Sequence, residues 1–365
     1  MASEAENREA FRIQAFYCER MAAPIYARLC RAIAAGLGRG SRTGARVLDW
    51  PGEPTRDALP LRLVGGLHAV VQAGADAGLA AVFRGEMADE PAIAAAVNAA
   101  LLAHDAALLP WLDGPPQTNE PGRSGALILG LLEVARRYGP RLEVLEIGSS
   151  AGLNLLIDRY RFDLGGTVVG PEGAPVTIRP EWQGEPHAPA AVEFVSVRGC
   201  DVRPLDATDP AVEARLAAYV WAETPARAAR LREAIAMQRA RPVELARADA
   251  ADWVEARLAE PQAAGVSRVL MHSVVWQYLP AESAARIRAA MAAVGARASG
   301  ARPLAWVAME PDRAIGDMLV QLRAWPGAGE WEVLATTHAH GAWVKPGGRE
   351  DLAPPMSEAM ARVEL

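Results

Sequence analysis

The sequence predicts an α/β protein in which a helical N-terminal domain precedes a mostly parallel sheet with an antiparallel C-terminal edge. Three observations support this class. Residues 1–113 show helical periodicity without strand alternation. Aliphatic segments then alternate with helical patterns over 142–309, as in sheets built from strand–helix–strand units. Short alternating segments over 317–344 are typical of antiparallel strands.

Length and composition limit the classes of protein to consider. The chain has 365 residues, 51% hydrophobic and 22% charged, so it can bury a large core in one or two domains. Its formal net charge of -6 provides no basic surface, and we expect no nucleic-acid partner. No apolar run approaches the roughly 20 residues that span a bilayer, so we expect no membrane contact. Three cysteines without metal-ligand spacing and an acidic, polar N-terminus predict a cytoplasmic protein.

Residues 1–116 are expected to form a helical cap or lid domain, followed by a second domain over 117–365. The turn-rich segment 42–60 is expected to be a loop. Because a helical cap closes a pocket, this organisation favours a small molecule as the partner. Helical patterns cover 11–37, which Pro24 kinks or splits, 61–73 and 91–109.

The stretch 142–156 organises the second domain. Its aliphatic start predicts a buried strand, its small residues a tight turn, and its end a helix. Glu146 closes the strand, where a carboxylate points into the crevice of an open α/β sheet. Gly148 and Gly152 frame a turn whose backbone approaches a ligand closely. We expect the following helix to direct its N-terminal N–H groups at the same place.

The acid-x-Gly-x-x-x-Gly arrangement resembles the first motif of class I S-adenosylmethionine-dependent methyltransferases. In that family, an acidic residue closes the strand and the glycine loop passes under the cofactor. The resemblance implies a Rossmann-like, methyltransferase-type sheet and S-adenosylmethionine as cofactor. Ser150 stands where the motif usually has its middle glycine, which tightens the space for the cofactor. The cofactor-binding residues implied in this stretch are Glu146, Gly148, Ser149, Ser150, Gly152 and Asn154.

The same turn has two other interpretations. Residues 148–152 also satisfy G-x-S-x-G, the nucleophile elbow of α/β-hydrolases, with Ser150 as nucleophile and His272 or His340 as base. A carboxylate such as Glu146 has no role in an elbow, and the helical N-terminus lacks the strands that precede one. The third interpretation is a turn without chemistry, in a non-catalytic protein that keeps the fold.

A polar cluster marks the boundary between the two domains. Asn119, Glu120 and Arg123 lie at the start of a predicted helix over 122–138. One interpretation is helix capping, with Asn119 as the N-cap. The other is the edge of a lid that contacts cofactor or substrate. Both interpretations stay open, because three such residues exceed what one cap needs.

The second core strand is expected at 192–197, after a hairpin insertion over about 160–190. An acid after this strand accepts hydrogen bonds from ribose hydroxyls in dinucleotide and adenosine sites. Asp201 is the first choice and Asp206 the second. The pair Asp249–Ala250 resembles the place where class I methyltransferases contact the adenine amino group. The alternative role for Asp249 is the N-cap of the next helix.

The strand over 267–275 is expected to run on through 276–280. The methyltransferase resemblance implies that this strand ends over the cofactor. Its polar and aromatic end predicts the lining of a cavity, because such groups are costly to bury without partners. His272 is the candidate general base, with a packed core histidine as the alternative. Tyr278 is the second catalytic candidate and Ser273 a further cofactor contact. The substrate candidates here are Trp276, Gln277 and Glu310, the last at the end of a strand over 303–309.

Three antiparallel strands are expected over 317–323, 331–336 and 341–344. His338 and His340 are spaced to share one strand face, but no third ligand has fixed spacing, so no metal site is predicted.

A second resemblance rests on Gln117–Glu120, Glu146–Asn154, His272–Tyr278 and His340–Trp343. Through these motifs nearly the full chain resembles a bacterial family, the domain of unknown function 2332 family. That resemblance implies a Rossmann-like fold similar to methyltransferases but no established activity. From the motif of the glycine loop we predict an S-adenosylmethionine-dependent methyltransferase acting on a small molecule, with a serine hydrolase and a non-catalytic protein as alternatives.

Overall fold

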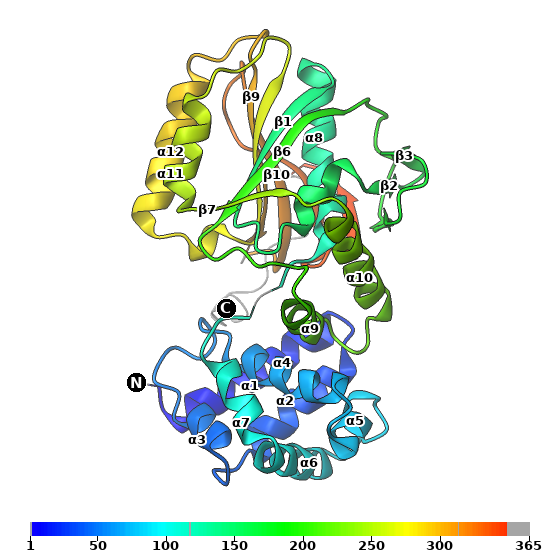
Figure 1. The fold of residues 1–365 in the computed structure, drawn as a ribbon, viewed down its shortest axis with the longest axis vertical. Helices are drawn as coiled ribbons and strands as arrows, with labels where there is room; N and C mark the ends of the chain where they lie inside the picture. Colours follow the sequence, from blue (N-terminus) through cyan, green and yellow to red (C-terminus); the bar gives the residue numbers. More distant parts are fainter. Residues whose placement is uncertain (1, 117, 313, 349–365) are drawn as a thin grey trace. The chain divides into compact units, whose positions relative to one another are not determined.

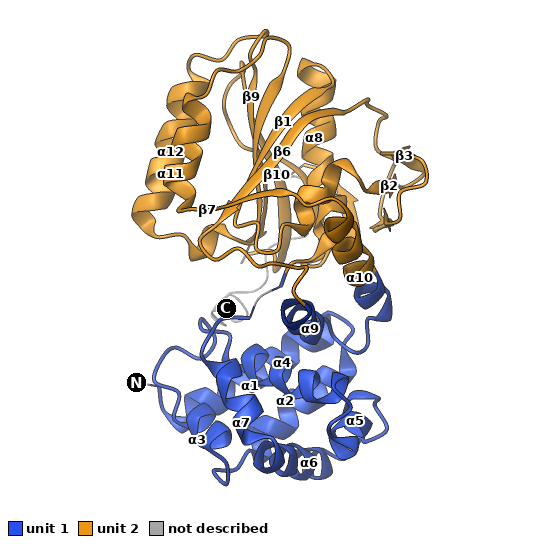
Figure 2. Cartoon of the chain, viewed as in Figure 1, with its two compact units in different colours: residues 1–118, 210–229, 362–365 blue, residues 119–209, 230–361 orange. Residues whose placement is uncertain are grey.

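The structure is a computed structural model that describes residues 2–116, 118–312 and 314–348. Gln117, one of the motif residues above, lies outside the described residues. The chain forms two compact units (Figures 1 and 2). Unit 1 contains residues up to 118 together with 210–229, and unit 2 contains 119–209 and the described residues from 230 onward.

The placement of 210–229 differs from the division at 116/117 inferred from sequence. Helix α9 (Pro210–Ala218) packs against α4 (Leu59–Gln72) of the N-terminal helices. A Cβ at Gly65 would lie 2.5 Å from the Tyr219 ring, so the glycine allows this close approach. The ring nitrogen Nδ1 of His68 also lies 3.0 Å from the carbonyl of Ala218. These contacts join two segments about 150 residues apart in the chain, which a local pattern does not reveal.

Unit 1 is helical, as predicted, but contains more helices than the sequence suggested. Pro24 begins a new helix, so the first pattern is split rather than kinked. The expected loop at 42–60 contains a seven-residue helix capped by Ser41, and a second short helix is capped by Asp76. Its other elements are α1 (Glu4–Arg20), α2 (Pro24–Gly36), α3 (Arg42–Leu48), α5 (Ala77–Phe83), α6 (Glu90–Ala103), α7 (Asp105–Leu108) and η1 (Leu109–Leu112).

The core of unit 1 includes a buried aromatic cluster around His68. The His68 ring stacks on Phe83 at 5.0 Å, and Tyr26 stacks on Trp221 at 5.3 Å. His68 Nδ1 lies 3.1 Å from the Tyr26 hydroxyl, and Nε2 lies 3.4 Å from the Gln72 amide. Burial lowers the pKa of His68. Both ring nitrogens therefore have partners in the packed interior.

Unit 2 is built on a nine-stranded sheet whose order is β5-β12-β11-β10-β9-β8-β1-β6-β7. The segment from β7 to β9 is parallel and follows the order 3-2-1-4-5, numbered along the chain, as in doubly wound folds. This confirms an α/β class with a large, mostly parallel sheet. The parallel strands are β1 (Arg141–Ile147), β6 (Glu193–Asp201), β7 (Glu244–Arg247), β8 (Ser267–Ser273) and β9 (Leu304–Asp312).

The antiparallel edge is also confirmed. Strand β10 (Asp317–Trp325) pairs with β9, β11 (Glu332–Thr337) with β10, and β12 (Trp343–Pro346) with β11. The two-residue strand β5 (Glu181–Trp182) adds to β12 in parallel. The prediction that His338 and His340 share a strand face is wrong. Both lie in the turn between β11 and β12, where the His340 N–H donates to His338 Nδ1 at 3.1 Å.

The connection from β1 to β6 differs from a regular strand–helix–strand unit. The α-helix expected after the glycine turn is a six-residue 3₁₀ helix, η3 (Leu153–Asp158). Side chains from outside the segment engage it: Asn119 Oδ1 accepts from the Leu153 N–H at 2.7 Å, and the Tyr160 hydroxyl donates to the Leu153 carbonyl at 2.7 Å. The predicted hairpin insertion follows as β2 (Arg161–Leu164), β3 (Thr167–Val169) and β4 (Thr177–Ile178), a separate three-stranded sheet.

Helices cover both faces of the large sheet (Figure 1). Helices α11 (Ala250–Ala259) and α12 (Ala281–Gly295) pack together on the face that carries Leu145, Leu270 and Trp306. Helix α8 (Ser124–Tyr138) covers the other face, where a Cβ at Gly130 would lie 2.6 Å from Val307. The 3₁₀ turns η2 (Pro121–Arg123) and η4 (Trp276–Tyr278) and helix α10 (Pro225–Ala240), which crosses the boundary of the two units, complete the set.

A buried ion cluster supports the amino-terminal ends of the strands. Arg268 on β8 donates from Nε to Glu143 of β1 at 2.8 Å. Its Nη1 donates to the carbonyls of Arg257 and Glu260 at the end of α11, at 3.0 Å each. Arg198 of β6 pairs with the same Glu143 at 2.5 Å. The cluster therefore ties three adjacent strands to the end of a covering helix, at the edge opposite the candidate site.

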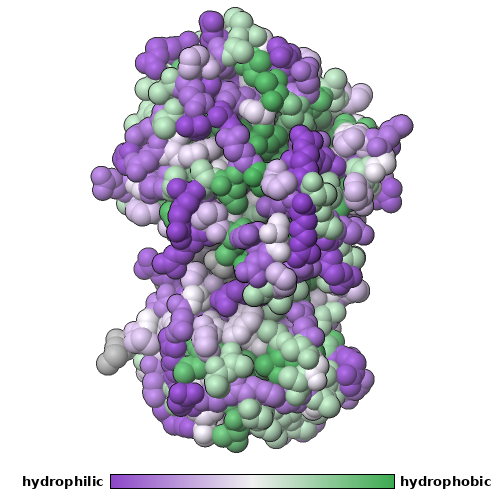
Figure 3. All heavy atoms as spheres, in the orientation of Figure 1, coloured by the Kyte–Doolittle hydropathy of each residue, from purple (hydrophilic) through white to green (hydrophobic). Residues whose placement is uncertain are grey.

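Hydrophilic and hydrophobic residues are interspersed on the face of each unit that Figure 3 shows. No single helix among the described residues is long and apolar enough to cross a membrane. Two bent helix pairs in unit 1, 59–72 with 77–83 and 90–103 with 105–112, pass that test only when joined.

Candidate functional site at the strand ends

The candidate site lies at the carboxyl ends of β1 and β8, in unit 2. From these neighbouring strands the connections diverge: the chain after β1 leads to β6 on one side, and the chain after β8 leads to β9 on the other. Such a switch point is where open α/β sheets bind ligands. Glu146, Asp201, His272 and Glu310 all lie at or near the ends of the four strands around it.

The glycine loop after β1 has three residues with positive φ: Gly148 at 66°, Ser150 at 53° and Gly152 at 74°. We predicted that the two glycines let the backbone approach a ligand, but protein side chains occupy the space beside them. A Cβ at Gly148 would lie 2.2 Å from Val275, and one at Gly152 would lie 2.8 Å from Val243. The glycines therefore accommodate side chains of the protein itself. A non-glycine residue at φ 53° is strained, which makes Ser150 a notable exception in this loop.

Asp201, at the end of β6, anchors the loop. Its Oδ2 accepts a hydrogen bond of 2.8 Å from the Ser150 N–H, and its Oδ1 accepts one of 2.8 Å from the Arg203 N–H. Asp206, the second ribose candidate, instead accepts from the Thr208 N–H at 2.9 Å in an exposed turn. Of the two acids, Asp201 is the one that contacts the glycine loop.

Glu146 is buried at the end of β1, with 2% of its surface exposed. Its Oε2 has no hydrogen-bond partner among the described residues. Burial raises its pKa to about 8, and the Asp201 carboxylate adds to the shift, whereas Ser149 and Arg123 oppose it. A buried carboxyl group with an unsatisfied oxygen is a feature of sites that hold a polar ligand.

The boundary cluster is buried beside this carboxylate. Asn119, Glu120 and Arg123 are 8%, 3% and 8% exposed. Glu120, not Asn119, caps η2 by accepting from the Gly122 N–H at 2.9 Å, and it also pairs with Arg230 at 3.0 Å. The expected N-cap role of Asn119 is wrong, because its amide oxygen bonds to the segment after the glycine loop. Arg123 Nε donates to the Ala339 carbonyl at 3.0 Å.

Two further contacts fix this cluster. Asn154, predicted to contact the cofactor, is buried, and its Oδ1 accepts from the Ser124 hydroxyl at 2.8 Å. Gly122 meets the β11–β12 turn at very close range. A Cβ on it would lie 2.6 Å from the His340 carbonyl, and a Cβ at Gly341 would lie 2.1 Å from the Gly122 carbonyl. Residues of three of the four sequence motifs, 117–120, 146–154 and 340–343, therefore lie around η2.

The Asp249–Ala250 pair follows β7. Asp249 caps α11: its Oδ1 accepts from the Ala251 and Asp252 N–H groups at 2.8 and 3.2 Å, and its Oδ2 lies 3.3 Å from the Ser283 hydroxyl. The capping alternative is thus present in the structure. Burial raises the pKa of the nearby Cys200 thiol to about 12, with further contributions from the charges of Asp201, Glu146 and Asp249. Three acidic residues therefore lie close to one point at the strand ends.

His272, at the end of β8, forms the most distinctive polar pair of the site. Its Nδ1 lies 2.7 Å from Oε1 of Glu310 on β9. The same oxygen accepts from the Val275 and Trp276 N–H groups at 3.0 and 3.2 Å. The Trp276 ring stacks on the His272 ring at 5.3 Å. His272 Nε2 and Glu310 Oε2 have no hydrogen-bond partner among the described residues.

The chain after His272 turns abruptly. The expected strand through 276–280 is wrong, because β8 ends at Ser273 and η4 follows. Val274 takes φ 53°, an outlier for a β-branched residue, and its N–H donates to the Met309 carbonyl at 2.9 Å. Ser273 is 9% exposed, whereas Tyr278 is 69% exposed and Gln277 is also exposed. Tyr278, the second catalytic candidate, therefore lies on the surface of unit 2.

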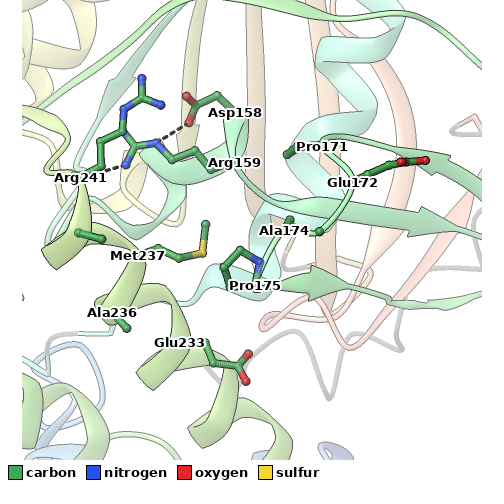
Figure 4. Close-up of a pocket in the computed structure, with 12 residues that line it drawn as sticks. Asp158, Arg159, Pro171, Glu172, Ala174, Pro175, Glu233, Ala236, Met237 and Arg241 are labelled. Carbon is green, nitrogen blue, oxygen red and sulfur yellow. Dashed lines mark hydrogen bonds and ion pairs between the residues drawn. The ribbon is translucent and has the colours of Figure 1, made fainter.

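A cavity of about 640 Å³ lies elsewhere in unit 2, between α10 and the segment 171–175 (Figure 4). Arg159 reaches the Arg241 carbonyl there and lies 3.4 Å from Asp158. Met237 and small residues form much of the rest of the lining. None of the site residues inferred from sequence lines this cavity. Among the described residues, no three His, Cys, Asp or Glu side chains gather as a possible metal-binding group.

The fold and the site define an α/β protein with a doubly wound parallel core and an acid-rich switch point. A family model described as "Uncharacterized protein conserved in bacteria (DUF2332)" matches residues 8–345. The chain belongs to this family, as its motifs suggested. No curated protein and no solved structure matches the chain.

Proposed function

We propose that unit 2 binds S-adenosylmethionine at the switch point and transfers its methyl group to a small molecule. The observation that carries this proposal is the parallel strand order 3-2-1-4-5, with Glu146 and Asp201 at the ends of the neighbouring strands β1 and β6. In doubly wound sheets, an acid after the second strand contacts ribose hydroxyls. Both acids lie beside the same glycine loop. One site could therefore bind the ammonium group and the ribose of the cofactor together.

The charge of the site favours a cationic adenosyl ligand over a dinucleotide. Glu146, Asp201 and Asp249 place three carboxyl groups around the strand ends. A pyrophosphate needs N–H groups at a helix N-terminus, and here the loop leads into the short 3₁₀ helix η3. S-adenosylmethionine instead carries a sulfonium and an ammonium group, which carboxylates attract. The acids that would repel a phosphate therefore support this cofactor.

Each acidic residue of the site would bind a different group of the cofactor. Glu146 would hold the ammonium group of the cofactor through its unpartnered oxygen, and Asp201 the ribose. Asp249 and Ala250 would approach the adenine. When bound, the cofactor supplies an electrophilic methyl group. The fit rests on these carboxyl groups and not on the glycine gaps, which Val275 and Val243 fill.

Calorimetric titration with S-adenosylmethionine and S-adenosylhomocysteine tests the proposal. In the folded protein without ligand the pKa of Glu146 is about 8, so its carboxyl group holds a proton at pH 7. Binding of an ammonium group favours the carboxylate and should release that proton. We expect micromolar affinity and a heat that depends on the ionisation enthalpy of the buffer. Glu146→Gln should weaken binding and abolish the proton release, whereas the exposed Glu193→Gln should change neither. No binding at millimolar ligand would reject the proposal.

A serine hydrolase remains the second candidate, favoured by the positive φ of Ser150 and by the His272–Glu310 pair. Asp201 opposes it, because its carboxylate lies 2.8 Å from the Ser150 nitrogen and would repel a developing oxyanion. A fluorophosphonate probe decides between the two. Labelling of the wild type that Ser150→Ala abolishes would establish the hydrolase, and absence of labelling would exclude it.

A further inference from the structure

The contact between His272 and Glu310 determines which ring nitrogen carries a proton. A carboxylate oxygen only accepts hydrogen bonds, so Nδ1, 2.7 Å from Glu310 Oε1, is the donor. The neutral ring therefore has its lone pair on Nε2. That atom is buried and has no partner among the described residues, although His272 is only 2% exposed. Leaving such an acceptor unpaired costs free energy of folding. A histidine with a purely structural role has nothing that offsets this cost.

His68 shows what a structural histidine looks like in this protein. It is nearly as buried, at 6% exposed, but both of its ring nitrogens have partners. The difference between the two residues is therefore not burial but the free acceptor on His272.

The backbone around His272 is held in a strained arrangement. Val274 has φ 53°, and Glu310 Oε1 ties the Val275 and Trp276 N–H groups to the same point as the imidazole. Such strain persists where the surroundings enforce it, and it clusters at functional sites. Trp276 stacks on the ring but is only half-buried, and η4 has no fully buried residue. Trp276 therefore covers one face of the His272 ring with a side chain that is itself partly exposed.

We propose that Glu310 is a positioning residue that fixes His272 with Nε2 as the base for the methyl acceptor. This inference rests on the proposed function and specifies its substrate class: an acceptor whose nucleophile is a hydroxyl oxygen or an N–H nitrogen. The proton of that O–H or N–H passes to His272 Nε2. The freed electron pair forms the bond to the methyl carbon, and the broken carbon–sulfur bond leaves its pair on sulfur. Imidazolium, methylated acceptor and neutral thioether balance the reaction.

The reactivity of Nε2 tests the dyad without any cofactor or acceptor. The full-length protein is treated with diethyl pyrocarbonate, and modified histidines are identified and timed by peptide mass spectrometry. We expect His272 to react in the native protein and His68 to stay unmodified, although both are buried. Trp276→Ala should accelerate the reaction of His272. Native-state protection of His272 equal to that of His68 would overturn the proposal.

Glu310→Gln tests the positioning role, because glutamine keeps an oxygen for the two backbone N–H groups, loses the charge, and places an NH₂ group where Oε2 has no hydrogen-bond partner among the described residues. We expect the reaction of His272 to slow about tenfold, as when a charged hydrogen-bond partner becomes neutral. The tautomer, read from the ¹⁵N shifts of labelled histidine, should be Nδ1–H in the wild type. An Nε2–H tautomer, or a reaction rate unchanged in Glu310→Gln, would refute the role. Exposed Glu282→Gln is the control, and circular dichroism monitors the fold.

These readouts separate the inference from the proposed function. Calorimetry with S-adenosylmethionine reports the cofactor site, whereas the diethyl pyrocarbonate rate and the ¹⁵N shifts report the dyad. Neither His272→Asn nor Glu310→Gln should change cofactor affinity, because both act on the acceptor. A protein that binds the cofactor but leaves His272 unreactive would refute the dyad alone.

Discussion

The backbone N–H of Ser150 donates a 2.8 Å hydrogen bond to Oδ2 of Asp201, which ties the glycine loop after β1 to the end of β6. The other oxygen of Asp201 holds the Arg203 N–H. In Asp201→Asn, an amide NH₂ replaces one acceptor, so one of these N–H groups loses its partner. We expect the free energy of unfolding, measured in urea, to fall by about 1–3 kcal/mol.

Asp206→Asn is the matched control for this change. Asp206 uses the single oxygen Oδ1 for both of its bonds to Thr208, and asparagine retains that acceptor. Its effect should stay within about 0.5 kcal/mol, the range of ordinary surface substitutions. Equal losses in the two variants would show that Asp201 has no special role in the loop.

Glu146 should make stability fall as pH rises. Its pKa is 4.5 in the unfolded chain and about 8 in the folded protein, so between these values the folded state holds the extra proton. The contribution of this proton to the free energy of unfolding is complete below pH 4.5. It is lost, at about 1.4 kcal/mol per pH unit, as the pH rises toward 8. Glu146→Gln removes the titration, so the variant should gain stability relative to the wild type between pH 5 and about 8.

Urea unfolding of both proteins at several pH values between 5 and 9 measures this difference. The difference between wild type and Glu146→Gln should stop changing above about pH 8. A difference independent of pH would mean that the carboxyl group is already ionised in the folded protein.

Ser150→Gly should stabilise the loop and open it. At φ 53° a side chain costs about 1 kcal/mol relative to glycine, so relieving it should raise the free energy of unfolding by about 0.5–1 kcal/mol. Glycine would also restore the middle position of the motif, and we expect tighter binding of S-adenosylmethionine by calorimetry. Ser150→Ala, which loses the hydroxyl but keeps the strain, should do neither. Weaker binding in Ser150→Gly would show that the serine side chain contributes a contact.

Arg268→Met should be destabilising, because it removes the guanidinium that donates to Glu143 and to two carbonyls at the end of α11, and leaves Glu143 paired with Arg198. Because Arg198 still compensates the charge of Glu143, we expect the free energy of unfolding to fall by about 1–3 kcal/mol, the cost of buried groups that lose a hydrogen-bond partner. Adding Glu143→Gln should not recover this loss, because it takes a carboxylate from Arg198 as well. Arg286→Met, whose ion pairs are exposed, should have little effect. Thermal and urea unfolding of the four proteins give the comparison.

Local patterns in the sequence predicted the elements that depend on local burial. The strand ending at Glu146, the hairpin at 161–169 and the antiparallel edge after Asp317 are all present. The 3₁₀ helix after Gly152 was not predicted, because the contacts that shape it come from Asn119 and Tyr160. Leucine-rich spacing alone favours an α-helix there, and tertiary hydrogen bonds override it.

The candidate site was predicted as a set of residue types but not as a set of contacts. His272 and Glu310 were both selected, yet their 2.7 Å contact depends on the register of β8 against β9, which pairs His272 with Ala308. Val275 and Val243 were missed altogether, and no signal in their own sequence marks them as neighbours of the glycine loop. The capping of α11 by Asp249 was predicted as an alternative, because an acid before a helix is a local signal.

Gly122 and Gly341 meet with almost no space between their backbones, although 218 positions of sequence separate them. Neither can acquire a side chain without pushing the two loops apart, and enlarging one cannot be compensated by shrinking the other, since neither has any atoms to give up. Across related sequences, both positions should therefore be retained as glycine. For protein engineering, the β11–β12 turn and the η2 turn form one module, which must be transplanted as a pair.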